Sequence, residues 1–286
     1  TSENRGCGTQ TAALGVGGYN GSAQTITYEY DGTCWSNGGS LGTARYSSGV
    51  EGTQTAAIDA SGAPAYSAET EIYDGTTWTS LGTILNTGRQ GPGCGGIQTA
   101  ALLASGEGPP VPGYYSGTEA FDGTTWTVLP ATVATARYNC GSAIGASQAT
   151  TTFFGGYGPG APANATEEFT EGSAINLARE GQVWYNSTTQ VLKGFGKQGT
   201  GAWASGGNLN TARHYSGAGG TQTAAILVGG TPAATETYDG STWTEILDPN
   251  TPRQGAGGAG TQTSLLYYGG NPASGATELW NGSTWT

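Results

Sequence analysis

Arginine is the chemically versatile residue with the most regular spacing in this chain of 286 residues. A guanidinium can hold an anionic ligand through two parallel hydrogen bonds, or it can pair with a carboxylate inside the fold. A residue that recurs once per repeated unit more often holds the unit together than performs chemistry. We therefore expect a structural ring formed by Arg5, Arg45, Arg89, Arg137, Arg179, Arg213 and Arg253.

Glutamate recurs with a similar period, in the segment that we interpret as the third strand of each unit. An Arg and a Glu at corresponding places can form a partly buried, bidentate pair that fixes one strand against the next. The competing interpretation is a cluster of arginines that holds an anionic substrate in a channel, which requires several of them to converge unpaired. The glutamates are Glu29, Glu71, Glu119, Glu167, Glu236 and Glu278.

Side chains suited to catalysis are few. The chain has a single histidine, His214, whose repeat equivalents are Tyr46 and Tyr138, so no Ser-His-Asp arrangement can be argued. A pair of carboxylates for glycoside hydrolysis could still converge in space, although the sequence singles out no pair. We expect no enzymatic activity, no cofactor and no zinc site, because no CxxC pair or histidine cluster accompanies Cys7, Cys34, Cys94 and Cys140.

The composition indicates a folded, Gly-rich β protein. The chain has 53 glycines, 10% aromatic residues and a net charge of −11. The acidic balance argues against nucleic acid or an anionic membrane as a partner. No apolar run approaches the roughly 20 residues that cross a bilayer, so we expect no membrane insertion.

Two phrases repeat along the chain in a constant order, and they predict the architecture. "QTAA" begins at Gln10, Gln54, Gln98 and Gln222, and an aromatic-Asp-Gly-x-x-Trp phrase such as "YDGTTW" follows each time. Each unit of about 40 to 50 residues contains four short strand patterns and a tight Asp-Gly turn. Because one such sheet cannot bury both of its faces, the units should stack around a ring as the blades of a β-propeller.

Counting one arginine per blade predicts seven blades in a single domain over residues 1–286. Residues 179–207 lack both phrases, but "NLARE" matches "NLNTARH" at 208–214 and Trp203 ends the segment, so we interpret it as a short, degenerate fifth blade. Its Lys193 and Lys197 would make a locally basic spot. The alternative is six blades plus an insertion near 173–206. The predicted blades are 1–42, 43–84, 85–132, 133–174, 175–207, 208–248 and 249–286.

The repeats resemble those of kelch-type propellers, which end the second strand in Gly-Gly and place an aromatic-Asp before a turn and a Trp after it. Gly pairs stand in "GVGG" (15–18), "FFGG" (153–156), "LVGG" (227–230) and "YYGG" (267–270). The wording "GGNLNTAR" with "GQVWYNSTTQVLKG" looks like kelch-like repeat proteins encoded by tailed bacteriophages of marine and aquatic bacteria. That resemblance implies a virion fibre or appendage component and a virion or extracellular location.

The kelch resemblance does not extend to the copper enzyme galactose oxidase, whose metal needs two histidines and two tyrosines. With His214 as its one histidine, the chain cannot assemble that site.

Connections between the second and third strands vary most, and they carry tyrosines among Gly, Ser, Asn and Pro. This composition is typical of adaptable recognition surfaces, and a tyrosine ring can stack on the apolar face of a sugar. We therefore expect a non-enzymatic structural or recognition module that contacts a host surface glycan or another virion protein. The alternatives are an extracellular carbohydrate-active enzyme and a bacterial adhesin. The candidate binding residues are Tyr19, Tyr66, Tyr114, Tyr115 and Tyr157.

Overall fold

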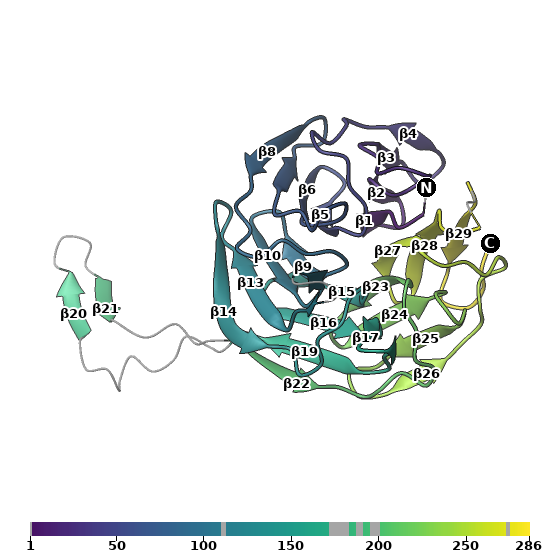
Figure 1. Ribbon diagram of the computed structural model, residues 1–286. Coiled ribbons are helices and arrows are strands. Elements are labelled where there is room, and N and C mark those ends of the chain that lie inside the picture. Colours follow the sequence, from purple (N-terminus) through teal and green to yellow (C-terminus); the bar gives the residue numbers. More distant parts are fainter. Residues whose placement is uncertain (1, 110–112, 172–182, 187–190, 195–200, 273–274) are drawn as a thin grey trace.

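The computed structural model describes residues 2–109, 113–171, 183–186, 191–194, 201–272 and 275–286. It is an all-β propeller in which six antiparallel sheets surround a central axis (Figure 1). The first strands of the sheets contact one another in a closed ring and therefore line the axis. In order around the ring they are β1 (Arg5–Thr9), β5 (Gly49–Thr53), β9 (Gly93–Ile97), β15 (Gly141–Ser147), β23 (Gly217–Thr221) and β27 (Gly257–Thr261).

The blades follow the chain without exchange of strands. Blade 1 contains β1 (Arg5–Thr9), β2 (Ala12–Val16), β3 (Thr27–Tyr30) and β4 (Trp35–Asn37). Blade 2 contains β5 (Gly49–Thr53), β6 (Ala56–Ala60), β7 (Thr70–Tyr73) and β8 (Trp78–Gly82). Blade 3 contains β9 (Gly93–Ile97), β10 (Ala100–Ala104), β13 (Gly117–Phe121) and β14 (Trp126–Thr132).

The other three blades have the same plan. Blade 4 contains β15 (Gly141–Ser147), β16 (Thr150–Phe154), β19 (Thr166–Thr170) and β22 (Ala202–Ser205). Blade 5 contains β23 (Gly217–Thr221), β24 (Ala224–Val228), β25 (Thr235–Tyr238) and β26 (Trp243–Glu245). Blade 6 contains β27 (Gly257–Thr261), β28 (Ser264–Tyr268) and β29 (Thr277–Trp280), followed by a bridge between Trp280 and Trp285.

The prediction of seven blades is wrong, and the six-blade alternative is the correct count. β22 pairs with β19 in the register Phe169↔Trp203, so Trp203 completes blade 4. The predicted blades 133–174 and 175–207 are thus one blade whose last two strands are separated by an inserted segment. Within that segment two short strands, β20 (Val183–Asn186) and β21 (Val191–Gly194), pair only with each other. Lys193 lies in β21, whereas Arg179 and Lys197 lie outside the described residues.

Tryptophan and glutamine connect each blade to the preceding one. The indole of Trp78 donates to the hydroxyl of Thr27 at 2.9 Å, and the indole of Trp35 donates across the seam between blades 1 and 6 to Thr277 at 3.0 Å. The amide of Gln54 donates to the carbonyls of Ala13 and Tyr30 in blade 1. Because these contacts recur from blade to blade, the ring closes without exchanging a strand.

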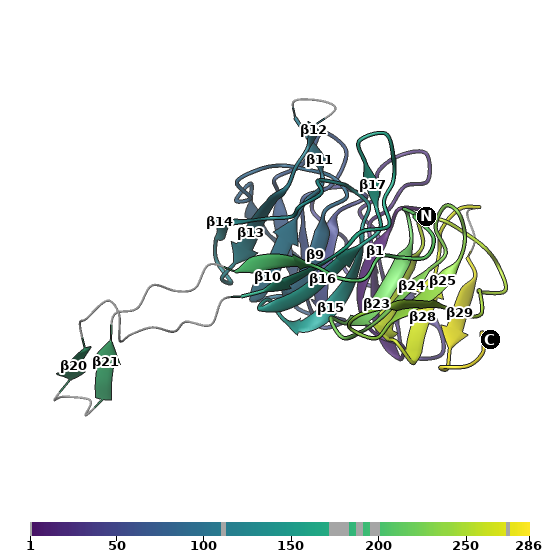
Figure 2. The same cartoon turned by 90° about the horizontal axis from the view of Figure 1, so that it is seen from below.

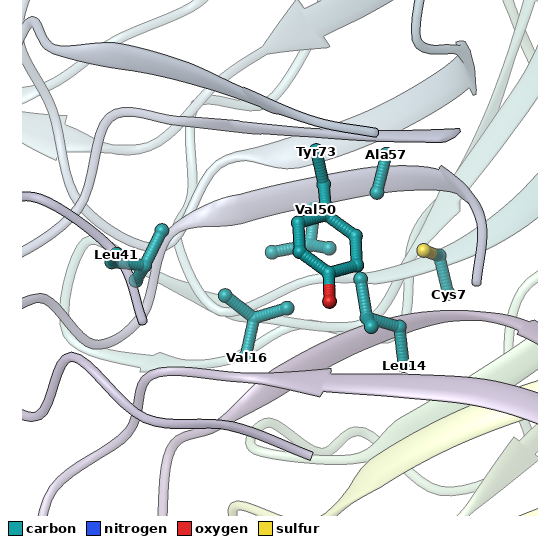
Figure 3. Packing of buried hydrophobic residues seen from close by; sticks show 7 residues of the cluster. All are labelled: Cys7, Leu14, Val16, Leu41, Val50, Ala57 and Tyr73. Carbon is teal, nitrogen blue, oxygen red and sulfur yellow. The ribbon is translucent and has the colours of Figure 1, made fainter. Parts of the chain in front are cut away.

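Apolar side chains fill the wedge between neighbouring blades. Between blades 1 and 2 the cluster combines residues of β1, β2, β5, β6 and β7 with Leu41 of the connection, as Figure 3 shows. Tyr73 lies in this cluster and donates its hydroxyl to Glu29 at 2.5 Å. Burial raises the pKa of Tyr73 to about 12. The whole cluster is Cys7, Leu14, Val16, Leu41, Val50, Ala57 and Tyr73.

The two faces of the ring are built differently. One face, which we call the turn face, carries the Asp-Gly turns between third and fourth strands. In blade 2 the Asp74 carboxylate accepts the backbone N–H groups of Thr76 and Thr77 at 2.9 and 2.7 Å, and Gly75 has a φ of 91°.

The opposite face, the loop face, carries the connections between second and third strands, which include the hairpins β11 (Glu107–Gly108) with β12 (Gly113–Tyr114) and β17 (Tyr157–Gly158) with β18 (Ala161–Pro162). Figure 2 shows β11, β12 and β17 rising from one side of the ring. Among the residues that the structure describes, no helix has the length and apolarity needed to cross a membrane.

Candidate recognition site at the channel mouth

Five of the seven arginines hold their own blade together. Arg45 donates to Glu71 at 2.5 Å and Arg137 to Glu167 at 2.7 Å, and Arg253 lies 3.3 Å from Glu278. The pairs Arg89–Glu119 and Arg213–Glu236 have the same arrangement. All of these side chains are buried, and the carboxylates also accept backbone N–H groups from the segment ahead of the arginine.

Blade 1 has no such pair among its described residues. In its third strand Tyr28 stands where the other blades have the paired glutamate, because Thr27 and Tyr28 match Thr70 and Glu71 of blade 2. Glu29 stands one position later and instead accepts the hydroxyl of Tyr73. The expectation that Glu29 belongs to the paired glutamates is therefore wrong.

Arg5 is not an equivalent of the paired arginines. It stands five residues ahead of Gln10, whereas Arg45 stands nine residues ahead of Gln54. Arg5 is the first residue of β1, a position that is glycine in β5, β9, β15, β23 and β27. Its side chain is therefore free of the structural role that the other described arginines have.

A ring of six backbone positions surrounds one mouth of the channel. Each blade contributes one residue with a left-handed φ between 49° and 63°. Backbone N–H groups of this ring donate to the carbonyl of the preceding blade: Glu3 to Gly255 at 2.8 Å, Gly255 to Tyr215 at 2.7 Å, and Ser47 to Glu3 at 3.1 Å. The six residues, which we call the mouth ring, are Glu3, Ser47, Gly91, Asn139, Tyr215 and Gly255.

Arg5 reaches across the channel at this mouth. Its Nη2 donates at 3.0 Å to the side-chain oxygen of Asn139, which belongs to blade 4 on the opposite side of the ring. Its Nε is buried and has no hydrogen-bond partner. Burial lowers the pKa of the Arg5 guanidinium, and the nearby Glu3 raises it. One charged group thus lies at the mouth with part of its donor capacity unused.

The channel below Arg5 is narrow. A cavity of about 60 Å³ is lined by at least one residue of each first strand, among them Arg5, Glu51, Cys94, Ser142, Gly217 and Gly257. The Oε2 atom of Glu51 is buried there without a hydrogen-bond partner, and burial raises the pKa of this carboxyl well above its ordinary value. The interior accommodates a few water molecules, whereas the mouth is the part that is open to a larger ligand.

Half-buried aromatic rings surround part of the mouth. Tyr114 lies 6.0 Å from Tyr138, which lies 5.9 Å from Tyr157, and Tyr157 lies 5.2 Å from His214. His214 in turn lies 4.8 Å from Tyr215 of the mouth ring. This continuous series, which we call the aromatic belt, connects the hairpins of blades 3 and 4 to blade 5.

The predicted tyrosines have different surroundings. Tyr114 and Tyr157 belong to the aromatic belt, whereas Tyr19 lies 5.1 Å from Tyr46 on the side of blades 1 and 2. Burial raises the pKa of Tyr46, and Glu3, Tyr19 and Tyr66 add smaller contributions in the same direction, so Tyr66 belongs to the same side of the ring.

Tyr115 faces its own blade: its hydroxyl donates to the carbonyl of Pro109, and its ring lies 5.6 Å from the guanidinium carbon of Arg89. It therefore packs the loop and is not part of the belt.

Four further aromatic residues lie on this face and were not among the predicted binding residues: Tyr46, Tyr138, His214 and Tyr215. A signal was present, because Tyr46, Tyr138 and His214 each directly follow a paired arginine. In all three blades the ring at that position contacts a tyrosine of a loop between second and third strands. Burial lowers the pKa of His214, and its Nδ1 is buried without a hydrogen-bond partner. The histidine is therefore a ring of the belt that favours its neutral form.

A second hollow lies beside the belt. Its volume is about 150 Å³, and it is lined by Ser2, Glu3, Tyr215, Gln254, Gly255 and Asn271. Polar groups dominate this hollow, and aromatic rings dominate the adjoining belt. Together with Arg5 they form a surface that can offer stacking, hydrogen bonds and one positive charge to a ligand.

Metal ligation and disulfides do not contribute to the described part of this site. Within the described ranges no group of three or more His, Cys, Asp or Glu side chains is arranged to hold a metal ion. The four cysteines are free thiols, of which Cys7, Cys94 and Cys140 are buried and Cys34 is exposed. Comparison with known proteins adds no assignment, because no protein-family model and no curated protein matches the chain.

Proposed function

We propose that this propeller is a non-enzymatic recognition module that binds a surface glycan through the aromatic belt on its loop face. The supporting observation is the series of half-buried rings from Tyr114 to Tyr215 around the polar mouth of the channel. Flat rings with part of their surface exposed stack on the apolar faces of sugars, and the neighbouring amide and carboxylate groups can bind hydroxyls.

The rings of the belt are attached to backbone that is held by buried ion pairs and hydrogen bonds between blades. Tyr138 and His214 follow buried, paired arginines, and Tyr215 belongs to the hydrogen-bonded mouth ring. A ligand that binds here meets rings that are already in place, so little conformational entropy is lost on binding. This arrangement is what a recognition surface requires.

The amino-acid sequence of the repeats supports a more specific proposal. In it the module is a kelch-like component of a bacteriophage virion surface, and its partner is a host glycan or another virion protein. The gene neighbourhood tests this: capsid and tail genes beside the coding sequence are expected. A neighbourhood of bacterial surface or secretion genes would instead favour an adhesin and would refute the virion assignment.

A glycan array on the isolated propeller tests the binding proposal. Tyr114→Ala should weaken binding to any hit, whereas Tyr114→Phe keeps the ring and should retain most of it. Val128→Ala is a matched surface control, because Val128 is exposed on the fourth strand of blade 3 and lies outside the belt. A glycan that binds Tyr114→Ala, Tyr157→Ala and the unmodified protein equally would place recognition elsewhere.

A further inference from the structure

The Arg5 guanidinium distinguishes the channel mouth from the rest of the ring. The other arginines with described positions are paired with a glutamate of their own blade. Arg5 makes none of the ion pairs found in the described part of the chain, and its one side-chain hydrogen bond, to Asn139, uses a neutral amide oxygen. A cation held at the mouth of a channel without a carboxylate partner is equipped to receive an anion.

The carboxylate nearest in its effect on Arg5 is Glu3, which makes its side-chain hydrogen bond elsewhere. Glu3 accepts the hydroxyl of Ser47 at 2.7 Å. Glu51 lies deeper in the channel, where burial favours its neutral form. The charge of Glu3 acts on Arg5 from a distance, but none of the ion pairs of the described residues includes Arg5.

The geometry limits what can approach Arg5. The channel cavity of about 60 Å³ is too small for a sugar ring, so a ligand reaches the guanidinium only from the loop face. There the aromatic belt ends at Tyr215. Burial raises the pKa of this phenol, the charge of Glu3 raises it further, and the charge of Arg5 lowers it, so both charged groups act on this ring. A ligand that stacks on the belt can therefore extend an acidic group toward Arg5.

We propose that Arg5 binds the carboxylate of an acidic sugar, so that the module recognises glycans containing a uronic or similar sugar acid. This inference rests on the proposed glycan function and specifies its ligand class. A guanidinium recognises a carboxylate through directed, charge-assisted hydrogen bonds. Within the described part of the chain Arg5 donates only from Nη2, to Asn139, so the rest of the Nη edge can serve a ligand. The aromatic surroundings favour a sugar over an acidic peptide as the carrier of that carboxylate.

Titration calorimetry with a galacturonate trisaccharide and its methyl ester tests the proposal. The two probes differ in charge and have the same sugar rings. The unmodified protein should bind the acid at least about tenfold more tightly than the ester, the factor expected for one charge-assisted hydrogen bond. Arg5→Gly should weaken acid binding much more than ester binding, so that the ratio of the two affinities falls to about one.

Arg5→Gly is a suitable variant because glycine is the residue that begins β5, β9, β15, β23 and β27. Its melting temperature, measured beside that of the unmodified protein, checks that the ring is intact. Arg5→Lys keeps the positive charge but lacks the planar guanidinium with its paired N–H donors. It should therefore show an acid preference between those of Arg5→Gly and the unmodified protein.

Several outcomes would overturn the proposal. Equal binding of acid and ester, or an acid preference that survives in Arg5→Gly, would remove Arg5 from recognition. An Arg5-dependent preference for a glutamate-rich peptide over the sugar acid would replace the glycan by a peptide. Binding of neutral glycans alone on the array would refute the role of Arg5 while leaving the proposed function intact, whereas no glycan binding at all would refute both.

Discussion

The contacts between and within blades use the same residue types around the ring, whereas the channel mouth uses a different side chain in nearly every blade. Trp and Gln recur at matching positions around the ring, and buried Arg–Glu pairs recur in blades 2 to 6. The mouth ring instead contains Glu, Ser, Gly, Asn and Tyr. The difference separates two tasks: repeated residues maintain the ring, and residues that depart from the repeat are available for recognition.

Removing one partner of a buried Arg–Glu pair should have the largest effect on the repeated set. Glu119 accepts hydrogen bonds from Arg89, Asn86 and Thr87. Glu119→Ala leaves the buried Arg89 without a counter-charge, and we expect a loss of about 3–5 kcal/mol in unfolding free energy. Denaturant unfolding measures this.

Two comparisons accompany that variant. Glu245→Ala, at an exposed site on β26, should have little effect. Arg89→Met combined with Glu119→Leu should lose less than Glu119→Ala alone. If Glu119→Ala unfolds like the Glu245 variant, the pairs do not hold the blades.

Replacing Asp59, a buried carboxyl at a position that is apolar in blades 3 to 6, should change the free energy of unfolding by a smaller amount that depends on pH. Asp59 stands on β6 where blades 3 to 6 have Leu103, Phe153, Leu227 and Tyr267. Burial raises its pKa to about 6, although Arg45 lies 3.9 Å away and lowers it. Because the folded pKa lies above the unfolded value of about 3.9, the protonated form adds stability that is complete below pH 4 and is lost as the pH rises through 6.

Asp59→Asn should remove this pH dependence. We expect the difference in unfolding free energy between the variant and the unmodified protein to change by about 2–3 kcal/mol between pH 4 and pH 7, with the unmodified protein losing stability as the pH rises. Thermal or denaturant unfolding at several pH values measures it. A constant difference across this range would show that Asp59 titrates normally.

Breaking one contact between blades should cost less than breaking an ion pair. The indole of Trp126 donates at 3.0 Å to the buried hydroxyl of Thr70 in blade 2. Thr70→Val keeps the shape and leaves the indole N–H unsatisfied, so we expect a loss of about 1–3 kcal/mol in unfolding free energy. Thr79→Val, at an exposed position on β8, is the matched control, and equal stability of the two variants would argue against a role for the bond.

The smallest effect should come from the turn face. Backbone N–H groups of Thr77 and Thr76 lower the pKa of Asp74, whereas Asn281 makes the same two hydrogen bonds without a charge. Since a depressed folded pKa contributes stability above the unfolded pKa and loses it as the pH falls, Asp74→Asn should lower the melting temperature slightly at pH 7 and not at pH 2. A shift of the same size at both pH values would contradict the charge argument.

The fold was largely predictable from the repeats, but the blade number was not predictable from arginine alone. Arg5 was counted as a repeated residue although it stands four positions too close to Gln10. Trp203 was assigned to a new blade because an inserted segment separates it from β19, its pairing partner. Strand pairing between residues distant in sequence decides such cases, and local patterns do not report it.

The candidate site was predictable only in part. Tyr114 and Tyr157 were identified from the composition of their loops, and they lie in the belt. Arg5 was missed as a ligand-binding candidate because its role depends on Asn139, which is 134 residues away in sequence and across the channel. A contact of that kind becomes visible only when the ring is assembled.

The mouth ring has a consequence for how this surface can diversify. Its backbone hydrogen bonds run between blades and do not depend on the side chains at the six positions, which already range from Gly to Tyr. The loops above it can therefore be exchanged one blade at a time while the spacing of the remaining five stays constant. The propeller is in this respect a modular scaffold, on which new binding specificities can be combined from separately varied loops.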